Sequence, residues 1–535
     1  MTDIPLLSIE NLSVAYREGD EITRVTHEVS FTIAHGEVVA LVGESGSGKS
    51  TTAQSVIGLL PENGRIETGS IRLNGEDIAH WSGKRFDVIR GKHISLIPQD
   101  PTSSLNPVKT VGAQVGEILR IHGERDRKAI ETRVIELLAR VGLTNPELRA
   151  KQYPHELSGG MKQRVLIAIA IALKPQLIIA DEPTSALDVT VQRRILDLID
   201  ELRRESGTAV LLVTHDLGVA ADRADRIVVL QGGRIQETGD TEQLLAAPRS
   251  AYAQRLLADA PSLATNTFRA PPPAGEDAII VDSLVHDFTT EGRKNFRAVD
   301  GVSFTVRRGT THAIVGESGS GKTTTVRDVV GFGEPTAGAI HIEGTNIGAL
   351  KGEALRKFRQ TIQLVYQNPF SSLDPRQTVF GIVEEPLINF GERDAAVRAE
   401  KVNALLERVS LPEALRKRRP RALSGGQRQR VAIARALILD PKVLVLDEAV
   451  SALDVTVQAQ ILKLLDELQK ERSLTYLFVS HDLAVVRQIS DTVSVLHNGK
   501  QVESGRVEDV FLRPQSDYTR ELIDAIPGKR SHALA

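Results

Sequence analysis

The feature that most constrains the fold is a glycine-rich segment that occurs twice, as GESGSGKS at 43–50 and as GESGSGKT at 316–323. Each segment follows a short apolar run and fits the pattern G-x-x-x-x-G-K-[ST] of a P-loop. Its glycines let successive backbone N–H groups face phosphate oxygens, its lysine reaches the β- and γ-phosphates, and its last hydroxyl is placed to hold Mg²⁺. The helix that follows turns its positive end to the anion. The sequence therefore predicts two sites for a nucleoside triphosphate.

Three further motifs recur in the same order in both halves of the chain. LSGG occurs at 157–160 and 423–426, an Asp-Glu pair begins 23 residues after each LSGG serine, and a histidine lies 34 residues beyond each aspartate. Motifs that recur in one order at equal spacings indicate a duplicated domain. We expect a first domain at 1–261, a proline-rich linker at 262–278, a second domain at 279–526 and a disordered tail at 527–535.

Each copy alternates short apolar strands with helical segments. In the first copy, β-branched stretches precede the P-loop, and residues 110–150 show the periodicity of a helical insert. A helix is expected from Val189 to Arg204, between the strands LIIA and AVLLVTH. This alternation, with a P-loop at a strand end, predicts an α/β fold with a parallel sheet covered by helices.

The two acidic pairs each end an apolar run, so we predict them at the tips of buried strands beside the P-loops. There Asp181 and Asp447 could order Mg²⁺ through its water shell. Glu182 and Glu448 would point the other way and could polarise the attacking water. The alternative interpretation is a pair of solvated acids at each strand end.

Other polar side chains follow neighbouring strands. His215 and His481 could hydrogen-bond the γ-phosphate as charge develops, and their equal offset favours this role over a structural one. Gln99 and Gln367 lie in loops after short strands, where an amide could reach Mg²⁺ or the attacking water. A loop glutamine that simply faces solvent is the alternative.

Aromatic residues and the LSGG segments complete the predicted sites. Tyr16 and Phe288 could stack on a base, or could be ordinary strand aromatics. Ser158 and Ser424 are predicted to open amphipathic helices, each a second anion-binding helix start. Because each copy has two such starts but one complete nucleotide site, we expect each LSGG to close over the P-loop of the other copy.

Composition narrows the choice of partners and cofactors. The 535 residues carry a formal net charge of only −3 and no cysteine. The small net charge gives no general attraction to nucleic acid, and the lack of cysteine excludes disulfides and Cys-ligated zinc or iron–sulfur clusters. The longest apolar run, Val165 to Leu173, is half a membrane span, and the first residues do not resemble a signal peptide. We expect a soluble or peripheral protein.

Together with SALD at 185–188 and 451–454, this set of motifs resembles that of the ABC-type ATPases. The segments QDPTSSLNP (99–107), QNPFSSLDP (367–375) and YPHELSGG (153–160), and the tail of each copy, resemble the dipeptide/oligopeptide/nickel importer subgroup. The resemblance implies two tandem domains, each with a RecA-like parallel-sheet core, an antiparallel β subdomain and a helical subdomain. It also implies two membrane-spanning permeases that dock near the glutamine loops, an extracytoplasmic solute-binding protein, and a place on the cytoplasmic face of the membrane.

Motifs and resemblance together predict the site residues. Those assigned to catalysis are Glu182, His215, Glu448 and His481, and those assigned to Mg²⁺ are Ser50, Gln99, Asp181, Thr323, Gln367 and Asp447. Those assigned to ATP are Tyr16, Gly43, Ser45, Gly46, Gly48, Lys49, Ser50, Thr51, Gln99, Ser158, Gly159, Gly160, Phe288, Gly316, Ser318, Gly319, Gly321, Lys322, Thr323, Thr324, Gln367, Ser424, Gly425 and Gly426. The expected cofactors are ATP and Mg²⁺, without an iron–sulfur cluster.

Some positions depart from the family pattern. The second acidic segment reads DEAVSALD instead of DEPTSALD but keeps both acids, so both sites are expected to be competent. LSGGM in the first copy replaces LSGGQ and loses one amide. The basic run Arg416–Arg419 reads as a solvated helix face, with a permease or phosphate contact as the alternative.

Related classes of ATPase fit the sequence less well. Fused sugar-importer ATPases usually have one degenerate half, and DNA-repair ABC proteins need coiled coils or zinc cysteines that this chain lacks. Soluble ABC-type translation factors, which act on ribosomes, usually carry a long charged helical linker, whereas this linker is short and proline-rich. Import of peptides or peptide-like solutes is therefore the favoured function. The sequence does not identify the solute.

Overall fold

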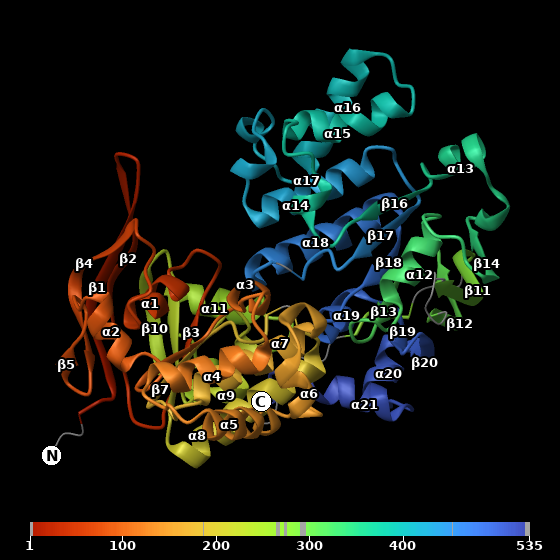
Figure 1. The fold of residues 1–535 in the computed structure, drawn as a ribbon. Coiled ribbons are helices and arrows are strands. Elements are labelled where there is room, and N and C mark those ends of the chain that lie inside the picture. The colour runs from red at the N-terminus through yellow and green to blue at the C-terminus, as the bar shows by residue number, and fades with distance from the viewer. Residues whose placement is uncertain are drawn as a thin grey trace. The chain divides into compact units, whose positions relative to one another are not determined.

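The computed structural model describes residues 4–185, 187–263, 268–271, 275–288, 296–451 and 453–529, apart from the side chain of Phe370 (Figure 1). The chain divides into two compact units, with the boundary after Leu263. Residues 527–529 belong to unit 1, and the other described residues after Leu263 form unit 2.

Unit 1 is built around a six-stranded sheet in the order β10-β9-β3-β8-β7-β6. All of its pairings are parallel except that of β10 with β9. The central strands are apolar along their whole length because helices and a second sheet cover the faces of this parallel sheet. The strands are β3 (Val38–Val42), β6 (Ile94–Ile97), β7 (Leu177–Asp181), β8 (Ala209–Thr214), β9 (Arg226–Gln231) and β10 (Arg234–Asp240).

A four-stranded antiparallel sheet, in the order β2-β1-β4-β5, packs against the first sheet. Its inward side chains share one hydrophobic core with β3, β7 and β8 and with the helix after the P-loop. The core therefore lies directly behind the P-loop and holds β3, the strand that precedes the P-loop, in place. The strands are β1 (Leu7–Glu18), β2 (Glu21–Ile33), β4 (Gly64–Leu73) and β5 (Glu76–Asp77).

Helices complete unit 1: α4, α5 and α6 pack together as the helical insert, and α7 packs against α4 and α5. The insert predicted at 110–150 is confirmed as α4 to α6. The α-helices are α1 (Lys49–Val56), α2 (Gly83–Ile89), α3 (Pro101–Ser104), α4 (Val111–Ile121), α5 (Arg127–Arg140), α6 (Pro146–Lys151), α7 (Gly159–Ile171), α8 (Val189–Ser206), α9 (Leu217–Arg223), α10 (Thr241–Ala246) and α11 (Ala251–Ala258). A 3₁₀ turn, η1 (Pro154–Glu156), precedes α7.

Unit 2 repeats this architecture. Its sheets run β16-β17-β18-β13-β19-β20 and β12-β11-β14-β15, with an antiparallel edge strand β20 in the larger one. The strands are β11 (Asp277–Phe288), β12 (Phe296–Arg307), β13 (Thr311–Val315), β14 (Ala337–Ile342), β15 (Thr345–Asn346), β16 (Ile362–Val365), β17 (Val443–Asp447), β18 (Thr475–Val479), β19 (Thr492–His497) and β20 (Lys500–Arg506). The predicted α/β fold class, with a parallel core, an antiparallel β subdomain and a helical subdomain, is confirmed.

The helices of unit 2 follow in the same order. In Figure 1, α15 and α16 stand beyond α17 as seen from the strands, as expected for a helical insert. The α-helices are α12 (Lys322–Val329), α13 (Gly352–Phe358), α14 (Pro369–Ser372), α15 (Val379–Asn389), α16 (Ala395–Arg408), α17 (Gly425–Leu437), α18 (Val455–Arg472), α19 (Leu483–Ile489), α20 (Val507–Leu512) and α21 (Asp517–Asp524). The 3₁₀ turns are η2 (Ile347–Ala349), η3 (Glu413–Leu415) and η4 (Pro420–Ala422).

Local predictions for three helical segments needed correction. Helix α8 ends at Ser206, two residues beyond the predicted end, because Gly207 adopts the left-handed conformation (φ 66°) that closes a helix. Helix α7 is not amphipathic over Val165–Ile171, where all but one residue is buried. The basic run Arg416–Arg419 lies between two 3₁₀ turns and not on a helix face.

The described parts of the predicted linker dock onto the two units. Ser262 is 8% exposed in unit 1. In unit 2, the Arg269 guanidinium lies 2.6 Å from Asp466 Oδ1 and 3.6 Å from Asp491 Oδ2, and donates to Gln469 Oε1 at 2.8 Å. Residues 264–267 and 272–274 of the predicted linker lie outside the described residues.

In unit 2, Arg269 of the linker makes an arginine–aspartate contact that helix α8 makes in unit 1. In unit 1, Arg203 of α8 contacts Asp225, the residue before β9. The matching positions of unit 2 are Gln469 and Asp491, so the helix lacks an arginine there and the linker provides one.

At the end of the chain, the first residues of the predicted tail also return to unit 1. Gly528 N–H donates to Asp222 Oδ2 at 2.8 Å. Residues 530–535 lie outside the described residues. None of the described helices combines the length and apolar character needed to cross a bilayer.

Candidate functional site

The candidate site of each unit lies where the parallel strands of the large sheet end. In unit 1, the P-loop follows β3, Gln99 follows β6, Asp181 ends β7 and His215 follows β8. Parallel strands bring their carboxyl ends to one edge of the sheet, which is where ligands bind in open α/β sheets. Unit 2 places Gln367, Asp447 and His481 at the ends of the corresponding strands.

The P-loop folds back over its own lysine. Lys49 is 6% exposed, and its Nζ donates to the backbone carbonyls of Gly43 and Glu44, both at 2.8 Å. Gly43 has a φ of 150°, and a Cβ there would lie 2.1 Å from the Leu230 carbonyl oxygen, so only glycine fits. Helix α1 begins at Lys49, directly after Gly48, so the N–H groups of its first turn point toward the loop.

The loop of unit 2 has the same geometry. Lys322 Nζ donates to the carbonyls of Gly316 at 2.7 Å and Glu317 at 2.8 Å. Five other loop positions assigned to ATP are exposed in the two units, namely Ser45, Gly46, Ser318, Gly319 and Thr323. Exposed backbone and hydroxyl groups at a helix start are accessible to a phosphate.

The acidic pair of unit 1 divides between two sets of partners. Ser50 Oγ donates to Asp181 Oδ1 at 3.0 Å. Glu182 accepts from Gln99 Nε2 at 2.8 Å and lies 3.1 Å from His215 Nδ1. Glu182 has a positive φ of 45°, and this left-handed turn accompanies the switch in partners from one residue to the next. The structure thus gives the two carboxylates different neighbours, as the prediction that they point in opposite directions requires.

These contacts separate the pKa values of the two acids. Burial raises the pKa of Asp181, against the hydrogen bond from Ser50. Burial also acts to raise the pKa of Glu182, but the hydrogen bond and charge of His215, with Lys49 and Gln99, bring it below the ordinary value. Burial acts to lower the pKa of His215, and the bond to Glu182 outweighs it and raises that pKa. Glu182 and His215 therefore stabilise each other's charged forms in a partly buried pair.

Unit 2 shows the same division. Gln367 Nε2 donates to Glu448 Oε2 at 2.7 Å, and His481 Nδ1 lies 3.3 Å from that oxygen. Burial, with repulsion from Glu448, raises the pKa of Asp447 to about 6. Burial acts to raise the pKa of Glu448, but the hydrogen bond and charge of His481 reverse the shift and lower it. Gln99 and Gln367 are both exposed, as the solvent-facing interpretation expects, but each side-chain amide also donates to a candidate catalytic carboxylate.

The LSGG serines cap their helices, as predicted. Ser158 Oγ accepts from Met161 N–H at 3.4 Å, and Ser424 Oγ accepts from Gln427 N–H at 3.3 Å. Gln427 also accepts the Ser424 N–H through its side chain, a capping box that methionine at 161 cannot form. Among the described residues, these serines take no part in the network around the acidic pairs.

Close packing explains the second glycine of each LSGG. A Cβ on Gly160 would lie 2.7 Å from Val191 Cγ1, and one on Gly426 would lie 2.4 Å from Val457 Cγ1. Gly159 and Gly425 have no such crowding, since their nearest atoms lie at 3.8 and 3.7 Å. The first glycine of each signature is therefore free of a packing constraint.

The two candidate base-stacking aromatics differ in their surroundings. Tyr16 is half-buried against the core of unit 1, and its hydroxyl lies 3.2 Å from Thr51 Oγ1. Phe288 is 47% exposed and lies against the His286 ring, with centroids 4.6 Å apart. Thr324, which corresponds to Thr51, is half-buried at the start of α12.

Sequence reasoning missed two tyrosines that touch the P-loops. Glu44 N–H donates to Tyr252 Oη and Glu317 N–H donates to Tyr518 Oη, both at 3.1 Å. The only sequence signal is that each tyrosine lies in a similar tail segment of its copy, APRSAYAQ and RPQSDYTR. In addition, Ser47 Oγ in the first loop is buried without a hydrogen-bond partner among the described residues.

Metal-ligand clusters of three or more His, Cys, Asp or Glu side chains are absent from the described part of the chain. A cation at these sites would depend on fewer protein ligands. In unit 1, two hard oxygen ligands, Ser50 Oγ and Asp181 Oδ1, lie 3.0 Å apart.

Comparison with known families gives two matches. The ABC transporter family matches residues 26–185 and 299–451. The C-terminal region of oligopeptide/dipeptide transporters matches residues 502–534.

Three relatives match over almost the whole chain. A peptidoglycan transport ATP-binding protein, YejF of Agrobacterium fabrum, is 43% identical and covers 97% of this chain and 96% of its own length. The oligopeptide transport ATP-binding protein OppD of Mycobacterium tuberculosis is 40% identical over 98% of both chains. The glutathione import ATP-binding protein GsiA of Pectobacterium atrosepticum is 42% identical over 98% of this chain and 89% of its own.

Proposed function

Because the chain belongs to the ABC transporter family and is an ATPase, we propose that it powers the import of peptides or peptide-like solutes through a pair of membrane permeases. The observation that carries this proposal is the match of residues 502–534 to the oligopeptide/dipeptide transporter C-terminal region. The names of the relatives, which refer to peptidoglycan, oligopeptides and glutathione, support the same solute class.

Both units keep a full set of reactive groups, so we assign an active ATP site to each. In this proposal Lys49 and Lys322 leave the loop carbonyls that they now bind and contact the phosphates of ATP. Glu182 and Glu448 polarise the attacking water, since their pKa values lie below the ordinary value and the carboxylates are ionised.

The remaining residues orient these groups. His215 and His481 each hold a catalytic carboxylate through Nδ1, which fixes the ring so that the other nitrogen can reach the γ-phosphate. Gln99 and Gln367 bind the same carboxylates and would release them when the nucleotide changes. Ser158 and Ser424, at their helix starts, are proposed to contact a phosphate of ATP.

The donor set of unit 1 fits Mg²⁺, which favours oxygen ligands and usually keeps several waters beside substrate phosphates. Ser50 Oγ and Asp181 Oδ1 lie 3.0 Å apart at the end of the P-loop. Ser50 and Asp181 in unit 1, and Thr323 and Asp447 in unit 2, would hold the ion. When bound with ATP it would neutralise phosphate charge during hydrolysis.

The proposal implies specific partners. The chain would lie on the cytoplasmic face of the membrane, bound to two membrane-spanning permeases, and an extracytoplasmic solute-binding protein would deliver the cargo. The comparisons give no support to the alternative of a ribosome-acting ATPase, because the relatives that they name are transport proteins.

A pull-down tests the proposed function. The tagged full chain is isolated in mild detergent and its companions are identified by mass spectrometry. Two multi-span proteins in equal amount are the expected result. Ribosomal proteins in their place would contradict the transport role and leave the ATPase chemistry intact.

A pair of variants tests the assignment of the catalytic acids. Glu182→Gln combined with Glu448→Gln should bind ATP but lose turnover, because the amide cannot accept the proton of water. Glu62→Gln with Glu334→Gln is the matched control, since it makes the same change at one exposed acid of each unit that has no assigned role, and it should hydrolyse ATP normally. Normal hydrolysis by the double glutamine variant would show that other groups polarise the water.

A further inference from the structure

Each P-loop is held from outside by a tyrosine in the tail helix of its own unit. The N–H of Glu44 donates to Tyr252 Oη at 3.1 Å, across 208 residues of sequence. The N–H of Glu317 donates to Tyr518 Oη at 3.1 Å, across 201 residues. The same contact in two copies of different sequence indicates a feature of the architecture and not an accident of one unit.

The tyrosine and the P-loop lysine form hydrogen bonds to opposite sides of one peptide group. Tyr252 accepts the N–H of the Gly43–Glu44 peptide, and Lys49 Nζ donates to the C=O of that same peptide at 2.8 Å. In unit 2 the Gly316–Glu317 peptide is held in the same way by Tyr518 and Lys322. The orientation of this peptide therefore determines where the lysine rests before it meets a phosphate.

The tail helices are themselves fixed, so the tyrosines are held at defined positions. Glu237 of β10 accepts the N–H groups of Arg249 and Ser250 just before α11, at distances of 2.8 to 3.0 Å. Tyr252 itself is 5% exposed. The tail helix of unit 1 is thus bound to the edge strand of the large sheet.

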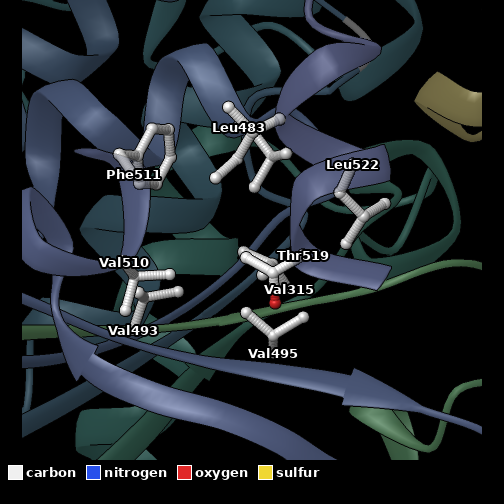
Figure 2. A pocket seen from close by; sticks show the side chains of 9 residues that line it. Val315, Leu483, Val493, Val495, Val510, Phe511, Thr519 and Leu522 are labelled. Carbon is white, nitrogen blue, oxygen red and sulfur yellow. The ribbon is translucent and has the colours of Figure 1, made fainter. Parts of the chain in front are cut away.

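Unit 2 anchors its tail helix in the same manner. Glu503 of β20 accepts the N–H groups of Gln515 and Ser516 at 2.9 and 3.0 Å. Thr519 and Leu522 of α21 face a small apolar pocket that Val315, the last residue before the P-loop, also lines (Figure 2). The helix that carries Tyr518 therefore packs against the strand end from which the P-loop springs.

From these contacts we infer that Tyr252 and Tyr518 are positioning residues that set the affinity of each P-loop for ATP. The inference rests on the proposed ATP sites and adds a role for the tail of each copy. Each hydroxyl holds the first peptide of the loop in one orientation, so the lysine and the loop N–H groups are arranged before ATP arrives. Preorganisation of this kind contributes to affinity because less freedom is lost on binding.

Tyrosine to phenylalanine variants of the full chain test the role, since they keep the ring and remove only the hydroxyl. Tyr252→Phe with Tyr518→Phe should raise the KM for ATP by roughly fivefold, the factor that corresponds to the ~1 kcal/mol of one neutral hydrogen bond. The kcat should change by less than about twofold, because the acids and histidines are untouched. A merely structural role would lower the amount of active enzyme, and hence kcat, without raising KM.

Tyr476→Phe is the matched control. Tyr476 is fully buried in unit 2, and its hydroxyl donates to the Leu465 carbonyl at 2.8 Å, away from the P-loop. This variant should leave the KM for ATP unchanged. An equal rise of KM in the control, or no rise in the double variant, would overturn the inference.

Hydrogen exchange of the nucleotide-free chain gives a second test that does not depend on ATP turnover. Tyr252→Phe should speed exchange in a peptide that covers 41–50 and not in one that covers 314–323, and Tyr518→Phe should do the reverse. Unchanged exchange in both peptides would refute the role of the tyrosines. If the wild-type chain failed to hydrolyse ATP, the proposed function would be wrong while this exchange test would still decide on the tyrosines.

Discussion

Protonation of His312 is expected to destabilise unit 2 in mildly acidic solution. His312 is the second residue of β13 and is 1% exposed. Its Nδ1 lies 2.8 Å from Thr492 Oγ1 and its Nε2 lies 3.0 Å from Ser494 Oγ, so a neutral ring satisfies both hydroxyls. The ring also stacks on Phe304 with centroids 4.7 Å apart. Burial lowers the pKa of His312 from 6.5 to about 3.

The size of the effect follows from these two pKa values. Between pH 6.5 and 3 the unfolded chain binds a proton at His312 that the folded chain does not, so the free energy of unfolding falls as the pH falls. With a folded pKa of about 3, unit 2 loses about 2 kcal/mol between pH 7.5 and pH 5.0 through this one side chain. The stabilisation is fully present above the unfolded pKa.

Urea unfolding of the full chain at pH 7.5 and 5.0 measures the effect. In the variant His312→Val, the pH-dependent loss should be smaller than in the wild type by about 2 kcal/mol. Valine is the natural choice because Val39 occupies the matching second position of β3. Far-UV circular dichroism follows both units. Fluorescence of Trp81, the only tryptophan, reports on unit 1 and should not respond to the substitution.

Two results would contradict this reasoning. If the wild type and His312→Val lost the same stability between the two pH values, within ~0.5 kcal/mol, His312 would not be the responsible group. If the Trp81 transition moved with the substitution, the effect would not be confined to unit 2. An exposed histidine of unit 1 serves as the control variant, His80→Gln, which should leave both transitions unchanged.

Two further substitutions test other contacts. Arg269→Ala should lower the stability of unit 2 by about 1–3 kcal/mol in urea unfolding, because Asp491, 8% exposed, loses a charged partner. Adding Gln469→Arg to this variant should restore part of the lost stability, if the linker arginine takes the place of the helix arginine of unit 1. Gly316→Ala should abolish ATP binding at the second site, because its Cβ would lie 2.1 Å from the Leu496 carbonyl oxygen. Gly301→Ala, which also has a positive φ (72°) but no atom within 4 Å of the added Cβ, should bind ATP normally in a fluorescent-nucleotide titration. ATP binding at the second site of Gly316→Ala, or loss of ATP binding by Gly301→Ala, would refute the steric argument.

Much of the active-site inventory was predictable because its motifs are local. Eight consecutive residues from Gly43 to Ser50 are enough to specify a P-loop, and equal spacings in the two halves indicate the duplication. The fold class followed from the alternation of apolar strands and helices, and the structure confirms it. Helix α7 shows where local patterns failed. It was predicted to be amphipathic, but its second half is buried on nearly all sides, and this burial depends on the helices packed around it.

Other contacts could not be read from any stretch of sequence. Gln99 meets Glu182 across 83 residues because β6 and β7 pair in parallel and end at the same edge of the sheet. The left-handed turn at Glu182, which accompanies the different partners of the two acids, also depends on that strand end.

The sequence by itself determined the candidate site residues and their occurrence in two copies, because P-loops, acidic pairs and histidines are defined by residue type and spacing. Only the tertiary structure decided that Tyr252 and Tyr518 hold the P-loops, and that Arg269 makes the contact for which α18 has no arginine at position 469. These contacts join residues far apart in the chain. Their existence depends on how tail helices and linker dock onto the sheets, which no local pattern encodes.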